Sequence, residues 1–160
     1  MEGSFHRSPP SEEEKHGYFR GLPSRPILVA RTSTDPWVMH EDSHCVYKTL
    51  DVVRKHAIND IWNTVPLCRD IMECLENVEM IALDILRLGY EHLSTVDEDR
   101  ESDKPVTMLI SVKKDSTDPS NGLAIVLRCQ EILCTYGLED VEVEMKEAVL
   151  VGGAAQFINP

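Results

Sequence analysis

His40, Glu41 and His44 have the spacing of the zinc-peptidase motif H-E-x-x-H. In that motif a helix places two imidazoles, four residues apart, on one face toward the zinc, and the glutamate serves as general base. Asp42 and Ser43 lie between the histidines here, and both residue types are unfavourable inside a helix. Because the chain has six histidines and many glutamates, a chance match is the simpler explanation. We therefore predict no metal or other cofactor, and keep this motif only as the basis of an alternative, a hydrolase.

No other catalytic motif is present. The five cysteines lack C-x-x-C spacing, and two of them, Cys129 and Cys134, fall in an apolar helical pattern. Such cysteines are typical of reduced thiols that pack as small apolar side chains inside a cell, so we expect a cytoplasmic protein. The sequence contains neither a G-x-S-x-G nucleophile elbow nor a glycine-rich phosphate loop. We therefore predict no catalytic residues.

The charge of the chain argues against nucleic acid and membrane partners. Its 28 acidic and 16 basic residues give a formal net charge of −12. An acidic surface repels phosphate backbones and anionic lipids. The acidic N-terminal stretch has no apolar centre typical of a secretory signal, and no apolar run approaches the ~20 residues of a membrane-spanning helix.

The last third of the chain shows the clearest secondary-structure pattern. Apolar and polar residues alternate over 106–112 and again over 140–147, which predicts two strands with one face on a core. Between these strands, apolar residues recur at helical spacing from after Asp118 and Pro119 up to Gly137, which predicts a helix. Aspartate is a favoured N-cap, proline suits the first helical turn, and glycine adopts the left-handed conformation that closes a helix.

The earlier elements are less sharply marked. Residues 26–32 form a short apolar run between turn-forming residues, which predicts a strand, and residues 33–55 predict a long loop with room for one helical segment. An apolar stripe over 57–76 predicts one helix, and because the stripe stays in phase across Pro66, we expect a kink there. Residues 79–89 predict a buried strand, with an extension of the helix as the alternative.

These elements give the order strand, helix, strand, strand, helix, strand. That order is typical of a ferredoxin-like βαββαβ two-layer sandwich, with an antiparallel sheet and both helices on one face. We predict a flexible tail over 1–25, one α+β domain over 26–150 and a C-terminal extension over 151–160. Tyr18, Phe19 and Leu22 are the side chains of the tail able to pin its end to the domain.

Four segments, 25–33, 56–62, 83–89 and 140–144, resemble motifs of an uncharacterised family of basidiomycete fungal proteins. The family motifs are similar to RPxLVARTS, HPLxxxW, DVVRIG and DVEVE. This chain differs in having Ala57 after the histidine and Pro66 within the helix. Longer members continue into a region with a weak resemblance to trypsin-like proteases, which this chain lacks. The resemblance implies an N-terminal accessory domain or a short paralogue, and it supplies no site residues.

The function predicted from these observations is a non-enzymatic accessory or protein-interaction domain. On an exposed outer sheet face, Leu109 is an apolar residue that favours a protein partner or self-association. The predicted interaction face consists of Thr107, Leu109, Ser111, Glu142, Glu144 and Lys146. The alternative is a hydrolase, either through the His40, Glu41 and His44 zinc motif or as part of a protease-like protein. A small-molecule binder on the open sheet face is a third hypothesis, by fold analogy alone.

Overall fold

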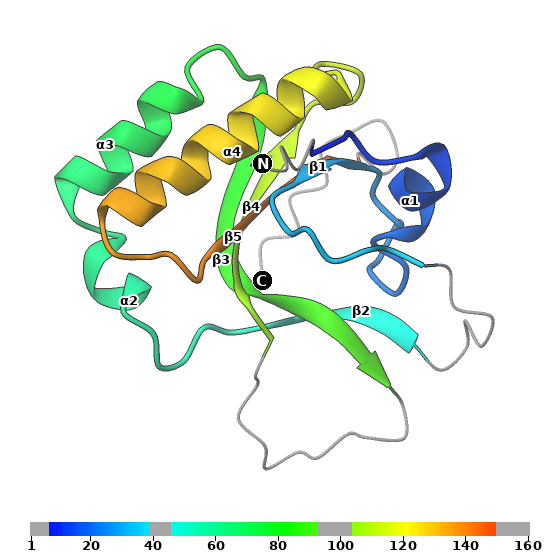
Figure 1. Ribbon diagram of the computed structural model, residues 1–160, viewed down its shortest axis with the longest axis horizontal. Helices are drawn as coiled ribbons and strands as arrows, with labels where there is room; N and C mark the ends of the chain where they lie inside the picture. Colours follow the sequence, from blue (N-terminus) through cyan, green and yellow to red (C-terminus); the bar gives the residue numbers. More distant parts are fainter. Residues whose placement is uncertain (1–6, 39–45, 93–103, 150–160) are drawn as a thin grey trace, which may run out of the picture.

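A five-stranded mixed sheet forms the centre of the protein. The computed structural model describes residues 7–38, 46–92 and 104–149. The sheet has the strand order β1-β5-β4-β3-β2, with β4 and β5 parallel and the other neighbours antiparallel (Figure 1). The strands are β1 (Leu28–Arg31), β2 (Val46–Asp51), β3 (Met80–His92), β4 (Val106–Val112) and β5 (Glu142–Glu147).

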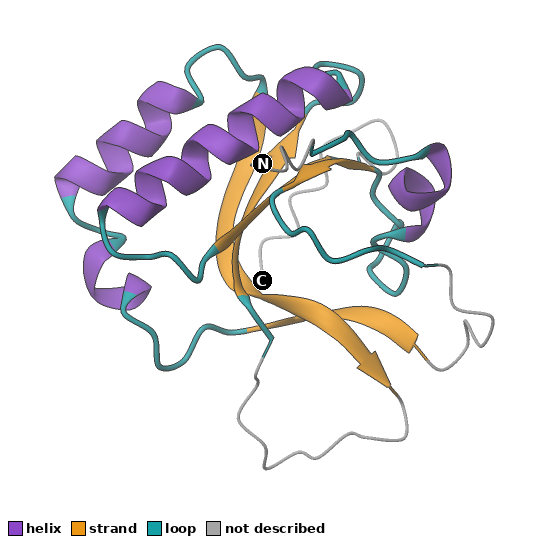
Figure 2. Ribbon diagram, in the orientation of Figure 1, coloured by secondary structure: helices purple, strands orange, loops and turns teal. Residues whose placement is uncertain are grey.

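Helices cover the two faces of the sheet unequally. The four helices of the described chain are α1 (Glu12–Gly17), α2 (Ile58–Ile61), α3 (Val65–Cys74) and α4 (Pro119–Thr135). α3 and α4 lie side by side against one face, and α1 lies on the opposite side of the sheet (Figure 2). The protein is therefore an α+β fold with a thick helical layer on one face and a short N-terminal segment on the other.

The central strand β4 is buried along its whole length. A strand with covered faces on both sides can be apolar at successive positions instead of alternating. Its inward residues toward the helices, such as Met108 and Ile110, join a core with Leu67 and Ile71 of α3 and Val126 of α4. Burial of this strand on both faces excludes a sheet with one fully solvated side.

α4 approaches the sheet closely because it carries Gly122 in its first turns. A Cβ atom at this position would lie 2.6 Å from Cγ1 of Val29 on β1. The predicted ends of the helix are confirmed. The Asp118 carboxylate accepts a hydrogen bond from the Asn121 amide at 3.0 Å, and Gly137 has a φ of 79° just after the helix.

The second face of the sheet is covered by the chain's own N-terminal segment. Tyr18 and Phe19, which follow α1, are 5% and 1% exposed and pack with Leu28, Leu88 and Leu109. The disordered tail predicted over 1–25 is therefore wrong for the described part of that segment. Large aromatic side chains bury enough apolar surface to order a short stretch of otherwise polar chain.

The ferredoxin-like prediction is wrong. β4 and β5 are adjacent, parallel and joined by α4, so they form an unsplit βαβ unit inside a mixed sheet. The ferredoxin-like arrangement is a split βαβ in an antiparallel sheet. Additionally, the sheet has a fifth strand, β2, where a long loop was predicted over 33–55.

The strand β2 could not be predicted from the spacing of its apolar residues, because a charged residue is buried in it and an apolar residue is exposed. Lys48 is 3% exposed, whereas Leu50, two residues further on the same face, is 46% exposed. Val46, Leu50 and Val53 also have helical spacing, which obscured the strand. The position of a buried lysine is a first indication that this part of the sheet is not merely structural.

Pro66 divides the predicted helix over 57–76 into two, so the predicted kink is wrong. α2 ends at Ile61, Thr64 is extended, and Pro66 is the second residue of α3. A proline is tolerated in the first turn because its missing amide hydrogen would have no intrahelical partner there. The strand predicted over 79–89 is confirmed as β3, which continues to His92 and pairs with β2.

Candidate ligand-binding pocket

A cavity of about 410 Å³ lies on the sheet face covered by the N-terminal segment. Its walls come from the residue after α1, from β1, β2, β3 and β5, and from the loop that follows β1. The lining residues are Tyr18, Arg31, Ser33, Asp35, Pro36, Trp37, Val38, Lys48, Leu88, Gly89, Tyr90, Pro105, Glu142 and Glu144.

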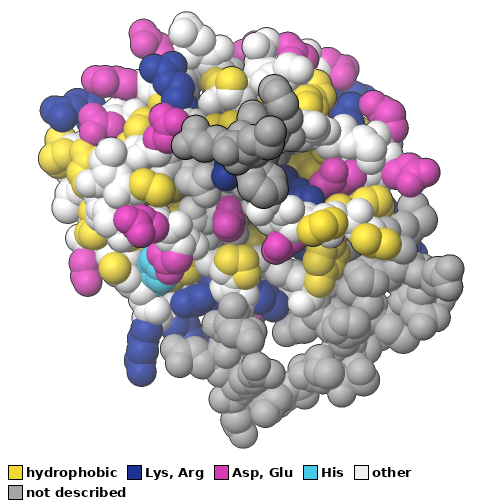
Figure 3. All heavy atoms as spheres, in the orientation of Figure 1, with side chains coloured by type: hydrophobic (Ala, Val, Ile, Leu, Met, Phe, Trp, Pro, Cys, Tyr) yellow, Lys and Arg dark blue, Asp and Glu magenta, His cyan; other side chains and the backbone are white. Residues whose placement is uncertain are grey.

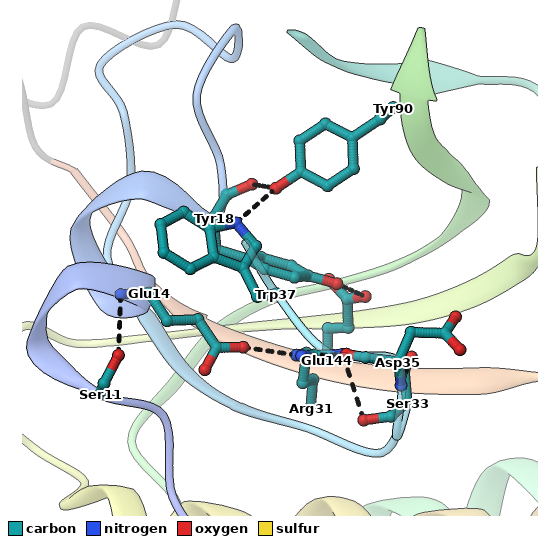
Figure 4. A network of polar contacts seen from close by, with 9 residues as sticks. All are labelled: Ser11, Glu14, Tyr18, Arg31, Ser33, Asp35, Trp37, Tyr90 and Glu144. Atoms are coloured by element: carbon teal, nitrogen blue, oxygen red, sulfur yellow. Dashed lines mark hydrogen bonds and ion pairs between the residues drawn. The ribbon is translucent and has the colours of Figure 1, made fainter. Parts of the chain in front are cut away.

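Glu144 of β5 lines this pocket and is 4% exposed. One carboxylate oxygen, Oε2, accepts a hydrogen bond of 2.7 Å from the Tyr18 hydroxyl (Figure 4). The other oxygen, Oε1, is buried without a hydrogen-bond partner among the described residues. A buried acceptor that lacks a partner costs about 1–3 kcal/mol, and more when it is charged. Glu144 therefore lines the cavity with one of its two carboxylate oxygens unused as an acceptor.

Burial raises the pKa of the Glu144 carboxyl above its ordinary value of 4.5. The positive charges of Lys48 and Arg31 and the hydrogen bond from Tyr18 oppose this increase, and Glu142 adds to it. A carboxyl with a raised pKa exchanges between an acceptor-only form and a form that also donates.

Lys48 of β2 is the second buried polar group of the pocket. Its Nζ lies 3.7 Å from the ring centroid of Tyr18 and 4.4 Å from that of Tyr90, so two aromatic faces hold the ammonium. Burial lowers the pKa of Lys48 from 10.5 to about 8, although the Glu144 carboxylate opposes the decrease. Within the described chain, the Lys48 ammonium has ring contacts but no hydrogen-bond acceptor.

The backbone of Lys48 is held by the segment that follows α1. The Lys48 amide donates a 2.7 Å hydrogen bond to the Arg20 carbonyl, and Gly21 passes so close that a Cβ there would lie 2.6 Å from Cβ of Tyr47. Gly21 also has a φ of 103°, which favours glycine. This turn thereby fixes both Tyr18 and Lys48 at the pocket.

Arg31 forms part of the pocket wall, and three of its five N–H donors are used in hydrogen bonds within the protein. Its Nε donates to the Glu14 carboxylate at 2.7 Å, and its terminal nitrogens donate to the carbonyls of Ser33 at 3.2 Å and Asp35 at 2.6 Å (Figure 4). These bonds tie α1 to the loop after β1. Arg31 is therefore a positioning residue, and its side chain also lies 5.2 Å from the Tyr18 ring centroid.

Trp37 and Tyr90 are two further aromatic residues in the wall of the pocket. The Trp37 indole nitrogen donates to the Tyr90 hydroxyl at 3.2 Å, and that hydroxyl donates to the Tyr18 carbonyl at 2.6 Å. Burial raises the pKa of Tyr90 to about 12, so this hydroxyl stays protonated at neutral pH. Figure 4 shows the chain of contacts from Trp37 through Tyr90 and Tyr18 to Glu144. The polar groups of the wall are thus satisfied, in contrast to Glu144 Oε1.

The predicted interaction face is divided by the structure. Thr107, Leu109 and Ser111 are buried, and Leu109 packs in the cluster with Tyr18 and Phe19. Glu142 and Glu144 line the pocket, with Glu142 accepting a hydrogen bond from the Thr32 hydroxyl. Lys146 is partly buried, and burial lowers its pKa against the opposing effect of Asp84.

The zinc motif falls in a different part of the chain. His40, Glu41 and His44 lie in 39–45, outside the described residues. In the ranges that the structure does describe, no cluster of three or more metal-binding side chains is found. His56 uses both ring nitrogens: Nε2 contacts the Asp140 carboxylate at 2.7 Å, and Nδ1 accepts from the Ile58 amide at 3.0 Å. It is therefore occupied at the start of α2.

Sequence reasoning missed most of the pocket. The pocket residues are spread along the chain, from Tyr18 and Arg31 through Trp37 and Lys48 to Tyr90, and none belongs to a catalytic or ligand-binding motif. Only the pair Glu142 and Glu144, on one face of β5, was recognised, and it was expected to be solvated. A lysine in the middle of a strand was the available signal, but it requires the strand itself to be recognised first.

Comparisons with protein-family models, curated proteins and solved structures find no match to this chain. The resemblance to a basidiomycete fungal family and the cytoplasmic location therefore stay predictions. Among the described helices, none combines the length and the apolar character needed to cross a membrane. On the face shown in Figure 3, acidic side chains are spread among basic and apolar ones and do not form a single patch.

Proposed function

We propose that this protein is a non-enzymatic binding domain that holds a small polar molecule in the pocket between Glu144 and Lys48. The ligand offers a hydrogen-bond donor to Glu144 and an acceptor to the Lys48 ammonium. A free amino acid, which carries an ammonium and a carboxylate on the same carbon atom, is the simplest member of this class. The single observation that carries the proposal is the buried, unpartnered Oε1 of Glu144 beside a buried ammonium in the same cavity.

Three further observations support the proposal. The cavity volume of about 410 Å³ lies within the ~300–1,000 Å³ range typical of small-molecule sites. The wall is aromatic, with Trp37, Tyr18 and Tyr90, and its polar groups are already satisfied, so the wall is rigid. The two buried charges are costly to the folded state without a ligand, which is typical of a site kept for binding.

Intrinsic fluorescence tests the proposal directly. The chain has two tryptophans, so the substitution Trp62→Phe leaves Trp37 in the pocket wall as the single indole reporter. We would titrate this variant with a set of zwitterionic amino acids and a set of neutral polyols. We expect saturable changes with at least one amino acid. If neither set produces a saturable change, or if only polyols do, the proposed ligand class is wrong.

Matched substitutions identify the site of binding. Lys48→Met and Glu144→Gln each remove one charge from the pocket and should abolish the fluorescence change. Lys114→Met and Glu131→Gln make the same chemical changes at exposed positions and should preserve it. Equal losses in the pocket and surface variants would show that the ligand binds elsewhere.

Of the three functions predicted from sequence, the small-molecule binder is the one that this proposal develops. Leu109 was expected to be exposed and to favour a protein partner, but it is buried by Tyr18 and Phe19, so that argument no longer applies. The zinc hydrolase stays a prediction, because its motif lies outside the described residues. Metal analysis of the purified full chain tests it, and zinc far below one equivalent would refute it.

A further inference from the structure

Two thiols are in contact on the helical side of the sheet, away from the pocket. Sγ of Cys74, the last residue of α3, lies 3.5 Å from Sγ of Cys129 in the middle of α4. Cys129 is completely buried, whereas Cys74 is partly exposed. The two residues are 55 positions apart, so only the packing of α3 on α4 brings them together.

We propose that Cys74 and Cys129 form a reversible disulfide when the protein meets a hydroperoxide. In this reaction the accessible Cys74 is oxidised first, and the buried Cys129 resolves the product. The inference concerns a site on the opposite face of the sheet from the pocket, and it does not depend on the proposed function.

The two steps balance with hydrogen peroxide as the oxidant. The Cys74 thiolate attacks one peroxide oxygen, the O–O bond breaks, and the leaving hydroxide takes up the thiol proton to give water and a sulfenic acid. The Cys129 sulfur then attacks the Cys74 sulfur, the S–O bond breaks, and the departing hydroxyl takes the Cys129 proton as a second water. Two thiols have lost two electrons, and one peroxide has become two waters.

The geometry favours pairing over further oxidation. The sulfur atoms must approach from 3.5 Å to the disulfide length of about 2 Å, a movement within the reach of side-chain rotation. Cys74 lies at the end of its helix, next to the non-helical cap Leu75, so its backbone is less constrained than that of Cys129. A sulfenic acid formed at Cys74 therefore has a thiol beside it before a second peroxide arrives.

The different surroundings of the two thiols agree with their order of reaction. Burial raises the pKa of the Cys129 thiol well above its usual range, and the neighbouring Cys74 adds to the increase. With its pKa raised and no access to solvent, Cys129 does not attack peroxide itself, and it loses its proton only to the hydroxyl that leaves the adjacent Cys74 sulfur. Cys129 therefore reacts only with a partner already in contact with it.

Peptide mapping of the wild-type chain tests the proposal. We would treat the folded protein with one equivalent of hydrogen peroxide, block the remaining thiols, and digest it without reductant. The expected product is one intramolecular disulfide that joins the peptides containing Cys74 and Cys129, and dithiothreitol should reverse it. The same treatment in denaturant is the control, where the five cysteines should give mixed pairings.

Single substitutions test the order of the steps. Cys129→Ala should leave a sulfenic acid at Cys74 that dimedone traps, whereas Cys74→Ser should leave Cys129 unmodified in the folded protein. The melting temperature of each variant shows whether it has folded. The proposal is overturned if the folded wild-type chain forms no Cys74–Cys129 disulfide, or if Cys74 proceeds to sulfinic acid while Cys129 stays reduced.

Discussion

Lys48→Met should stabilise the folded protein, which is unusual for a substitution at a buried position. The pKa of Lys48 falls from 10.5 to about 8 on folding, because burial removes water from the ammonium. Each pKa unit corresponds to about 1.4 kcal/mol, so holding this charge in the folded state costs about 3 kcal/mol at pH 7. Methionine has a similar length and packs well against aromatic rings, so it removes the charge without leaving a large cavity.

The net gain is smaller than the cost of the charge. The contacts of Nζ with the rings of Tyr18 and Tyr90 contribute about 1–2 kcal/mol, and the substitution removes them. Without Lys48 the pKa of Glu144 rises further, and this carboxyl takes up a proton instead of remaining an uncompensated buried charge. We therefore expect an increase of about 1–2 kcal/mol in the free energy of unfolding at pH 7.

Urea denaturation at several pH values separates this explanation from a general packing effect. Between pH values of about 8 and 10.5, the unfolded wild-type chain binds more protons at Lys48 than the folded chain does. The contribution of Lys48 to wild-type stability should therefore increase with pH over that interval, and Lys48→Met should lack this increase. The advantage of the variant at pH 7 should disappear near pH 10.5. A variant that is less stable than wild type by more than about 1 kcal/mol at pH 7 would refute the reasoning.

Three other substitutions test the same region and the helical layer. Tyr18→Phe removes the hydrogen bond to Glu144 and should lower the free energy of unfolding by about 1.5–3 kcal/mol in urea titrations; a loss below about 0.5 kcal/mol would contradict it. Because the pKa of Glu144 is raised on folding, its contribution to wild-type stability should fall as the pH increases above 4.5, and Glu144→Gln should remove that contribution from stability–pH curves; parallel curves would count against it. Gly122→Ala should lower the melting temperature through overpacking of about 1–3 kcal/mol against Val29, whereas an unchanged melting temperature would show that α4 can shift freely.

The secondary structure was predictable where a single physical cause dominates. The strands of the last third alternate regularly because they lie on a core, and α4 has a cap at Asp118 and a left-handed glycine at Gly137. The α+β class was predictable but the sheet topology was not, because strand order depends on which edges meet in space. The pattern of β4, α4 and β5 is the same whether the two strands are neighbours or are separated by another strand.

The pocket could not be predicted because it depends on exceptions to the usual pattern. Lys48 is buried and Leu50 is exposed on the same strand, which is the opposite of what hydrophobic burial favours. Glu144 occupies a position that alternation assigns to solvent, and it is buried only because a segment from the other end of the chain covers it. The sequence on either side of a polar residue does not show that a distant segment of the chain will cover that residue.

The contact between Tyr18 and Glu144 also determines when this protein can complete its fold during synthesis. It joins residues 126 positions apart, so the ribosome must synthesise the chain through β5 before the N-terminal segment has its final surface to pack on. Until then Tyr18 and Phe19 stay without the strand that holds them, and a long loop must close before the contact forms. The N-terminal segment, which is made before all five strands, therefore reaches its native position among the last.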